Sequence, residues 1–297
     1  MTDFAPDQPE RKISADIRFY PSRALQPGLI TSYYFTEIHG PAGTEIEDWL
    51  HPEWGNLRLG FGPVWDIGQA DGGLAPAPHA ALFGPTSRAR AFRARPGLML
   101  GIGFTPEGWA SLVKMPASAL ADAWAPADAV LPGIAALRER LEHAGDDQAR
   151  IALLDDWLTS LLPRYYRPDP KIAAILAGLG NPEEQTVEEL ARHLGMTPAR
   201  LVRACRRWFG FSTKTLLRRQ RFLRTLASLL EPQGRPISEV LDHAYCDQSH
   251  FNREFRRFMG MSPRAYFALP RPLLRSAASS RLREVGAALQ GLHRLQR

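Results

Sequence analysis

The sequence contains only two cysteines, Cys205 and Cys246. Two thiols cannot build a disulfide framework or a four-cysteine zinc site. The chain also lacks a run of roughly 18 uninterrupted apolar residues, which argues against a membrane-spanning helix. Its first residues lack the basic-then-apolar pattern of a signal peptide. These absences favour a protein of the reducing cytoplasm with no membrane partner.

Signatures of catalysis are missing as well. The sequence has no phosphate-binding loop and no dinucleotide fingerprint. No cysteine lies in residues 1–170 to act as the nucleophile of a repair methyltransferase. His39, His51 and His79 occur there, but without a His-x-His pair and a following Glu. We therefore expect no enzyme activity, no catalytic residue, no cofactor and no metal site.

Charge is distributed unevenly along the chain, whose net charge is +6. Residues 1–170 hold 15 Lys and Arg against 21 Asp and Glu, a net charge of −6, whereas residues 171–297 hold 22 against 10, a net charge of +12. The cations of the second half are almost all arginine, whose planar fork suits phosphate oxygens and guanine edges. Only the second half is therefore expected to bind a polyanion.

The pattern of apolar residues along the sequence predicts an α+β protein. After a disordered tail over residues 1–12, the stretch from Ala15 to Phe104 has short apolar runs broken by Gly and Pro, which predict a β-sandwich or a cupin-like barrel. The clearest predicted strands are Leu29–Ile38, Asn56–Phe61, Ala80–Phe83, Ala89–Arg93 and Leu98–Phe104. Helical spacing follows in Pro106–Lys114, Pro116–Trp124, Ile134–Ala144 and Gln148–Leu162.

These patterns divide the chain into a β-rich sensor or dimerisation domain over residues 13–163, a proline-marked linker over 164–170 and an all-α domain over 171–270. A basic tail over 271–297 is expected to be loose from Pro270 to Ser280 and helical from Arg281 to Leu295.

The all-α half contains one pattern twice, at an offset of 50 residues. Thr197–Thr213 reads TPARLVRACRRWFGFST, and Asp247–Pro263 reads DQSHFNREFRRFMGMSP. The two copies share Arg203/Arg253, Arg206/Arg256, Arg207/Arg257, Gly210/Gly260 and Ser212/Ser262. Such a repeat indicates a duplicated structural unit.

Each copy predicts a helix-turn-helix. In the first, Thr186 and Glu189 form a capping box, Gly195 supplies the turn, and Thr197 with Pro198 opens the second helix. In the second, Ser238 opens Glu239–His243, and Gln248–Met259 is the second helix. The stretch Leu216–Leu230 predicts a rigid helix that connects the two units.

Helical spacing separates an apolar face from an arginine-bearing face on both second helices. In the helix-turn-helix arrangement, the N-terminal part of the second helix reads base edges in the major groove. Arg203 and Arg253 are placed to donate two hydrogen bonds to guanine, and Gln248 is placed to read adenine. The later Arg pairs are expected to contact phosphates, which fix register without reading sequence.

Thr186–Leu269 resembles the DNA-binding domain of the AraC/XylS family of bacterial transcription regulators, through LARHLGMTPARLVRACRRWFG, RRQRFLR and DQSHFNREFRRFMGMSPRAYF. The resemblance implies two helix-turn-helix units, joined by a linker helix, on adjacent turns of double-stranded DNA. Carried over by position, the base-reading candidates are Ala199, Val202, Arg203, Gln248, Ser249, His250 and Arg253. The phosphate-binding candidates are Thr197, Arg200, Arg206, Arg207, Asn252, Arg256 and Arg257.

Three positions depart from the family pattern. Ala244-Tyr245 stands where the family usually has Gly-Phe, Cys246 stands where a polar cap is usual, and Thr213 replaces a common proline. Asp247 or Ser249 is left to cap the following helix.

The role of the first half is open between two readings. The resemblance extends to the β-rich sensor region of these regulators, through FYPSRALQPGLITSYYF and GIGFTPEGW, and names no ligand. Aromatic residues that could line an effector pocket are Trp49, Trp54, Phe61, Trp65, Phe104 and Trp109. In the alternative reading, this half only pairs with a second copy, as the stripe of Gln148–Leu162 suggests. The expected partners are DNA, a small-molecule effector, a second copy of the chain, and RNA polymerase if the protein activates transcription.

Overall fold

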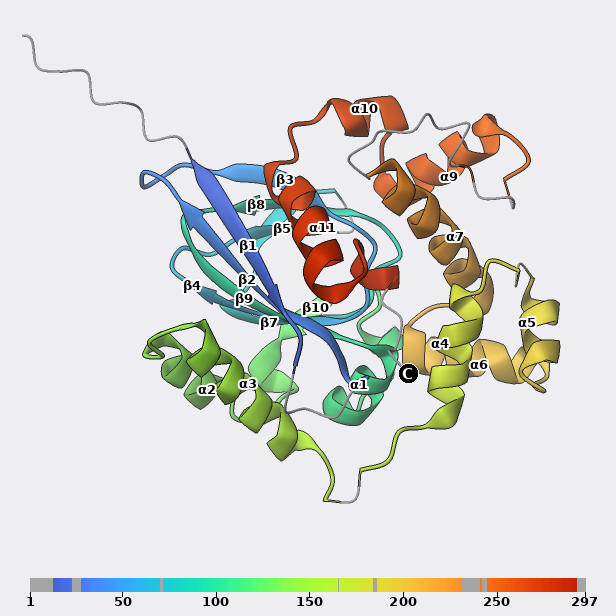
Figure 1. Cartoon of the computed structure of the whole chain (residues 1–297), viewed down its shortest axis with the longest axis horizontal. Helices are drawn as coiled ribbons and strands as arrows, with labels where there is room; N and C mark the ends of the chain where they lie inside the picture. The colour runs from blue at the N-terminus through green and yellow to red at the C-terminus, as the bar shows by residue number, and fades with distance from the viewer. Residues whose placement is uncertain are drawn as a thin grey trace, which may run out of the picture.

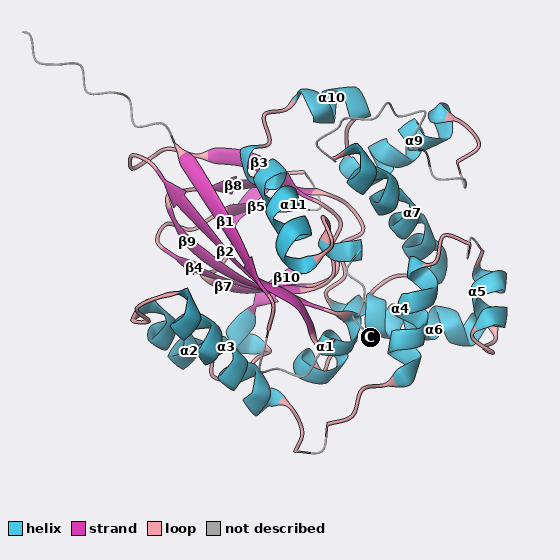
Figure 2. Ribbon diagram, viewed as in Figure 1, coloured by secondary structure: helices cyan, strands magenta, loops and turns pink. Residues whose placement is uncertain are grey.

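The structure is a computed structural model that describes residues 13–22, 28–69, 72–164, 166–183, 186–230, 241 and 245–292. The predicted tail over residues 1–12 lies outside them. The described chain has a β-rich N-terminal half followed by helices, and a helical C-terminal half (Figure 2). This arrangement confirms the predicted α+β class.

Two antiparallel sheets, of six and four strands, form the N-terminal half in the described residues (Figure 1). The larger sheet has the order β1 (Ser14–Tyr20), β2 (Ile30–His39), β9 (Gly97–Phe104), β4 (Asn56–Phe61), β7 (Ala80–Phe83) and β10 (Trp124–Pro126). The smaller sheet has the order β3 (Ile46–Leu50), β8 (Arg90–Ala94), β5 (Asp66–Gly68) and β6 (Leu74–Pro76).

Strand β2 is buried on both faces. Tyr33 and Phe35 join a core cluster with residues of the helices that follow the sheet, whereas Ile38 joins a second cluster with residues of both sheets. Successive side chains of a strand point to opposite faces of the sheet, so residues of β2 enter the two clusters alternately. Tyr34, on the second face, pairs in register with Gly101 of β9. A Cβ at Gly101 would overlap the Tyr34 ring, so glycine is required for the ring to lie against β9.

Short helices continue from the larger sheet. Helix α1 (Pro106–Gly108) runs into a π-helical turn over Trp109–Val113, and α2 (Ile134–Glu142) and α3 (Asp147–Leu161) pack beneath the sheet (Figure 1). The helix predicted over Pro116–Trp124 is wrong. That stretch has a 3-10 turn over Ala117–Ala119, and Trp124 begins β10, because it pairs with Phe83 on β7.

The apolar face of α3 packs within the chain itself. Ile151, Leu154 and Leu158 are buried in the core cluster against the larger sheet. The stripe that suggested a purely pairing role for the N-terminal half therefore packs on the chain's own β-sheet.

The C-terminal half comprises α4 (Pro170–Gly180), α5 (Val187–His193), α6 (Pro198–Phe209), α7 (Thr213–Leu229), α9 (Gln248–Met259), α10 (Pro263–Ala268) and α11 (Pro272–Val285), with a 3-10 turn over Gln290–Leu292. The connecting helix is thus confirmed as α7. No helix in the described part of the chain is long and apolar enough to cross a membrane.

The position of the last helix differs from the prediction. It begins nine residues earlier than the predicted Arg281–Leu295 helix, at Pro272, and ends before Gly286, whose φ is 75°. Asp48 of β3 accepts hydrogen bonds from the backbone N–H groups of Leu273 and Leu274, at 3.0 and 2.9 Å. The sequence signal was missed because this cap comes from a distant strand rather than from a neighbouring residue. The helix also packs on β1 and β3 instead of forming a loose tail.

Candidate nucleic-acid interface

The first helix-turn-helix unit, α5 with α6, is capped as its sequence predicts. The Thr186 hydroxyl accepts from the Glu189 N–H at 3.1 Å, and the Glu189 carboxylate accepts from the Thr186 N–H at 2.9 Å. Gly195 forms the turn with a φ of 62°, and Thr197 caps α6 by accepting from the Arg200 N–H at 3.3 Å. These contacts satisfy orphan donors of both helices within one short segment.

The second unit is described from Tyr245 onward. Asp247, not Ser249, caps α9 by accepting from the His250 N–H at 2.7 Å, and Gly260 ends the helix with a φ of 74°. The predicted opening helix Glu239–His243 falls outside the described residues except for Leu241, as do Ser238 and Ala244. The described part therefore contains the second helix of this unit with both of its caps.

Both second helices bury one face and expose the other. Leu201, Cys205 and Phe209 of α6 are fully buried, and burial raises the pKa of the Cys205 thiol to about 11, so it is core rather than a reactive group. On α9 the buried face contains Phe251, Phe255, Phe258 and Met259. The predicted inward faces are therefore confirmed.

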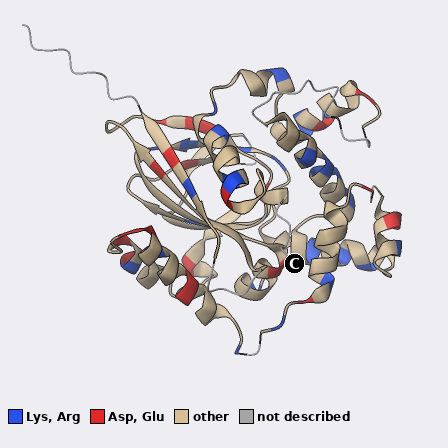
Figure 3. Ribbon diagram, in the orientation of Figure 1, with Lys and Arg blue, Asp and Glu red and all other residues tan. Residues whose placement is uncertain are grey.

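The predicted DNA-contacting residues lie on the opposite faces. Most are exposed, namely Thr197, Ala199, Arg200, Arg203, Arg206, Arg207, Gln248, Ser249, Arg253, Arg256 and Arg257. Val202, His250 and Asn252 are half-buried. In the part of the chain that the structure describes, the arginines of α6 and α9 have no ion-pair partner. Figure 3 shows Lys and Arg along α6, α7 and α9, and Asp and Glu concentrated in the N-terminal half. The exposed arginines are thus free to bind phosphates or bases.

One buried acid on α9 was not anticipated from the sequence. The Glu254 side chain is 1% exposed and receives Nε of Arg218 at 2.5 Å and Nη2 of Arg221 at 2.9 Å. Both arginines come from α7, so this ion pair fixes α9 against the connecting helix. A charged residue on the otherwise apolar inner face of α9 was the available signal, because a buried carboxylate requires a partner.

Helices α6 and α9 lie at opposite ends of α7 (Figure 1), and the N-terminal half contacts α7 itself. Arg219 of α7 is fully buried, and its Nη1 donates to the carbonyls of Thr86 and Glu53, at 3.0 and 3.3 Å. Its guanidinium lies 3.8 Å from the ring centroid of Trp54. Burial lowers the pKa of Arg219 to about 9.

Each helix-turn-helix unit has its own contact with the β-rich half. Trp54 packs edge-on against Phe209 of α6, with ring centroids 5.7 Å apart. Beyond α9, the hydroxyl of Tyr266 lies 2.6 Å from Nε2 of His51, and the Ala89 N–H donates to the Phe258 carbonyl at 2.6 Å. These contacts hold both units while their arginine-bearing faces stay exposed.

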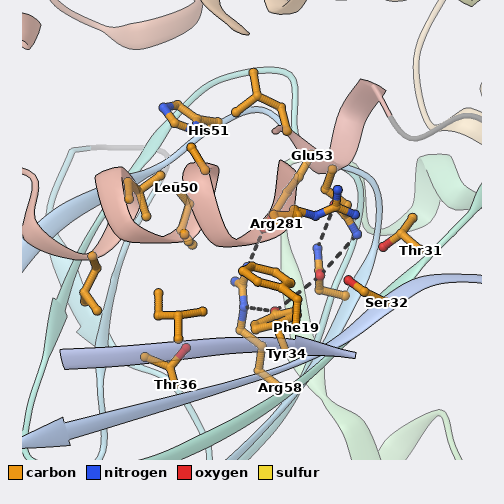
Figure 4. Close-up of a pocket in the computed structure, with 18 of the residues that line it drawn as sticks. Phe19, Thr31, Ser32, Tyr34, Thr36, Leu50, His51, Glu53, Arg58 and Arg281 are labelled. Carbon is orange, nitrogen blue, oxygen red and sulfur yellow. Dashed lines mark hydrogen bonds and ion pairs between the residues drawn. The ribbon is translucent and has the colours of Figure 1, made fainter. Parts of the chain in front are cut away.

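A cavity of about 130 Å³ lies where both sheets meet α11. Its apolar lining includes Ile17, Phe19, Leu50, Trp65, Phe92, Met99, Leu273 and Leu274. Its polar lining includes Thr31, Ser32, Tyr34, Thr36, Asn56 and Gln290, and three charged groups, Glu53, Arg58 and Arg281 (Figure 4). Of the aromatic residues that the sequence offered for a pocket, Trp65 lines this one, whereas Trp54 packs on α6 and α7, and Phe104 and Trp109 belong to the core.

Within the described residues, no group of three His, Cys, Asp or Glu side chains is arranged to hold a metal ion. His51 lies in the cavity wall, and burial lowers its pKa to about 3, with a further contribution from Arg271. It therefore stays uncharged at neutral pH.

Comparison with known proteins places the helical half in a recognised group. Residues 190–268 match a family model described as a helix-turn-helix domain. The C-terminal domain of AraT, a response regulator from Geobacillus stearothermophilus, is 30% identical over 31% of this chain and 75% of that chain, with a TM-score of 0.27.

Other solved structures match over a longer stretch at low identity. ToxT from Vibrio cholerae is 10% identical, with 86% of this chain and 98% of that chain covered and a TM-score of 0.44. The AraC-like transcriptional activator CuxR is 14% identical over 77% of this chain and 90% of that chain, with a TM-score of 0.31. No curated protein matches. With the capped helices α5, α6 and α9 and the family match over residues 190–268, the chain belongs to the AraC/XylS family of DNA-binding transcription regulators.

Proposed function

We propose that this regulator binds a specific DNA sequence by placing α6 and α9 in the major groove, with residues 171–270 as its DNA-binding domain and 13–163 as its sensor. Base edges are read by Ala199, Val202, Arg203, Gln248, Ser249, His250 and Arg253. Phosphates are bound by Thr197, Arg200, Arg206, Arg207, Asn252, Arg256 and Arg257. The observation that carries this proposal is that all fourteen side chains lie exposed or half-buried on two helices whose other faces are packed.

The chemistry of the two helices gives them different reading power. Arg203 and Arg253 can each donate two hydrogen bonds to one guanine, and Gln248 can pair with adenine. Ala199 and Val202 offer only apolar contact, which suits thymine methyl groups. We therefore expect stricter recognition under α9 than under α6.

The second element of the proposal is control by a small molecule bound in the cavity between the sheets and α11. The cavity combines a mainly apolar wall with a few polar groups, as small-molecule sites do. The same half of the chain contacts both helix-turn-helix units through Trp54, Ala89 and His51. A ligand that favours one packing of these contacts would change the presentation of the reader helices. A second copy of the chain and, for an activator, RNA polymerase complete the proposed partners.

The direct test is selection of DNA fragments by the purified full chain, followed by gel shifts on the selected site and on a scrambled site of equal composition. We expect the selected site to bind at least about 10³-fold more tightly, as for specific regulators. Equal binding to both would overturn the proposed sequence specificity. For effector control, a metabolite panel is screened by thermal shift, and hits are repeated in the gel shift; a ligand of the native state raises the melting temperature. A panel without a single hit that changes DNA affinity would contradict control by a small molecule.

A further inference from the structure

The cavity carries an unbalanced positive charge. The guanidiniums of Arg58 and Arg281 are buried, with side chains 6% and 4% exposed. Glu53 is the only acid in the wall of the described cavity, and its carboxylate is 2.5 Å from Nη2 of Arg58. Among the described residues, no carboxylate forms an ion pair with the Arg281 guanidinium, which donates through Nη1 to the Ala287 carbonyl at 2.8 Å. Burying an uncompensated charge costs several kcal/mol.

Hydrogen-bond donors of these two arginines are also unused. Nη1 of Arg58 and Nη2 of Arg281 are buried without a hydrogen-bond partner among the described residues. Arg58 comes from β4 and Arg281 from α11, so the two side chains line opposite walls of the cavity (Figure 4). Burial lowers the pKa of Arg281 to about 10, which leaves it charged at neutral pH. Two unused donors and one excess charge are the complement of a carboxylate or a similar anion.

The rest of the wall sets the size and character of the ligand. Trp65, Phe92 and Met99 line the side of the β-rich half, and Leu273 and Leu274 line the side of α11. The cavity of about 130 Å³ is similar to engineered apolar cavities of about 150 Å³ that accept one benzene ring. The apolar part of the ligand should therefore be no larger than one ring.

We propose that this cavity binds a small amphipathic monoanion, whose charged group is received by Arg281 together with Arg58 and whose apolar body lies under α11. This inference rests on the proposed effector control and names the chemical class of the effector. It also makes the helix beyond the DNA-binding domain part of the binding site. The bound anion would connect α11 to β4, and α11 follows α10, whose Tyr266 contacts His51. Ligand binding is thus linked to the second helix-turn-helix unit through α10 and α11.

The test uses two ligands of nearly identical shape, cyclohexanecarboxylate and its neutral isostere cyclohexanecarboxamide, titrated by calorimetry into the full chain at pH 7. We expect the carboxylate to bind at least about tenfold more tightly than the amide. Arg281→Gln should reduce carboxylate affinity to that of the amide, and Arg281→Lys should retain part of the preference. Arg283→Gln is the matched control, because it removes the same charge from an exposed position on the same helix.

Equal affinity for the two ligands would overturn the proposed class, as would an equal loss in Arg281→Gln and Arg283→Gln. Absence of binding by either ligand at about 10 mM would also overturn it. The wild-type comparison remains decisive if Arg281→Gln fails to fold. Gel shifts with each ligand test the anion class and the effector control independently. Carboxylate binding that leaves DNA affinity unchanged contradicts control, whereas a neutral metabolite that alters DNA affinity preserves control and contradicts the anion class.

Discussion

At the scale of single residues, α6 and α9 separate exposed residues, to which we assign DNA contacts, from buried residues that pack in the core. Equivalent arginines recur in α6 and α9, and all of them stay exposed. His51 and Arg219, two polar residues that connect the halves of the chain, are buried instead. Substitution of an exposed arginine should therefore change DNA binding, whereas substitution of a buried residue should change folding stability.

Arg253 and Arg257 provide a matched pair on α9. Arg253→Ala should cost about 1–3 kcal/mol of binding and relax specificity at one base pair, because a guanidinium fork to guanine is lost. Arg257→Ala should weaken every sequence alike and reduce the salt slope by about one unit, because one phosphate contact is lost. Gel shifts on a set of single-base variants, at two salt concentrations, distinguish these outcomes. Uniform loss for Arg253→Ala would contradict its base-reading assignment.

His51 predicts a pH dependence of folding stability. Its pKa is lowered to about 3 in the folded chain, from an ordinary value near 6.5. Protons therefore bind the unfolded chain preferentially, and the contribution of His51 is complete above pH 6.5 and is lost as the pH falls toward 3. Between pH 6.5 and 5.5 this loss is about 1 kcal/mol. Urea unfolding should show that His51→Gln loses less stability over this interval than the wild type. Parallel pH profiles of the two proteins would refute the assignment.

At the scale of elements, the orientation of α9 depends on a contact that leaves the helix. Its two caps, Asp247 and Gly260, determine where it begins and ends. Glu254 determines how it lies on α7, since it accepts from Arg218 and Arg221. The aromatic cluster around Phe222 and Phe255 packs beside this ion pair. The orientation of α9 on α7 should therefore depend on Glu254.

Glu254→Gln tests this dependence with almost no change of shape. The substitution leaves two arginines without their carboxylate, and loss of one partner from a buried pair costs about 3 kcal/mol or more. Arg218 and Arg221 are partly exposed, so we expect a decrease of about 2–3 kcal/mol in the free energy of unfolding. Glu284→Gln, at an exposed position on α11, serves as the control and should change stability by less than about 0.5 kcal/mol. Similar small effects of both substitutions would refute a structural role for the pair.

At the scale of the whole molecule, the two halves share their cores. One cluster combines Trp54 of the β-rich half with residues of α4, α6 and α7, and another combines strand residues with Leu273 of α11. The buried guanidinium of Arg219 lies over Trp54 at the centre of this contact. Cores that cross the boundary in this way should make the two halves unfold together.

Calorimetry of the full chain should therefore show a single unfolding transition. Trp54→Ala should cost about 3–5 kcal/mol, as for a buried tryptophan, and should separate the unfolding of the two halves into two transitions. Trp49→Ala removes a half-buried tryptophan from the same half and serves as the control, with one transition retained. Two transitions in the wild type would show that the shared cores do not couple the halves.

The helix-turn-helix units could be predicted from the sequence because their signals are local. Caps at Thr186, Thr197 and Asp247, and turns at Gly195 and Gly260, lie within a few residues of the helices that they limit. The period of apolar residues then determines which face of α6 and α9 is exposed. The exposed faces of α6 and α9, with their arginines, could therefore be predicted from the sequence alone.

The cavity, the docking contacts and the last helix were decided by tertiary structure. Asp48 caps α11 from β3, Gly101 leaves room for the Tyr34 ring across the sheet, and Arg58 and Arg281 meet from opposite walls. The strand at Trp124 likewise exists only because β7 pairs with it. These groups lie far apart along the chain, and local spacing carries no information about which strand or helix will bury them. Their roles arise only when the folded chain removes them from water and leaves each buried charge in need of a partner.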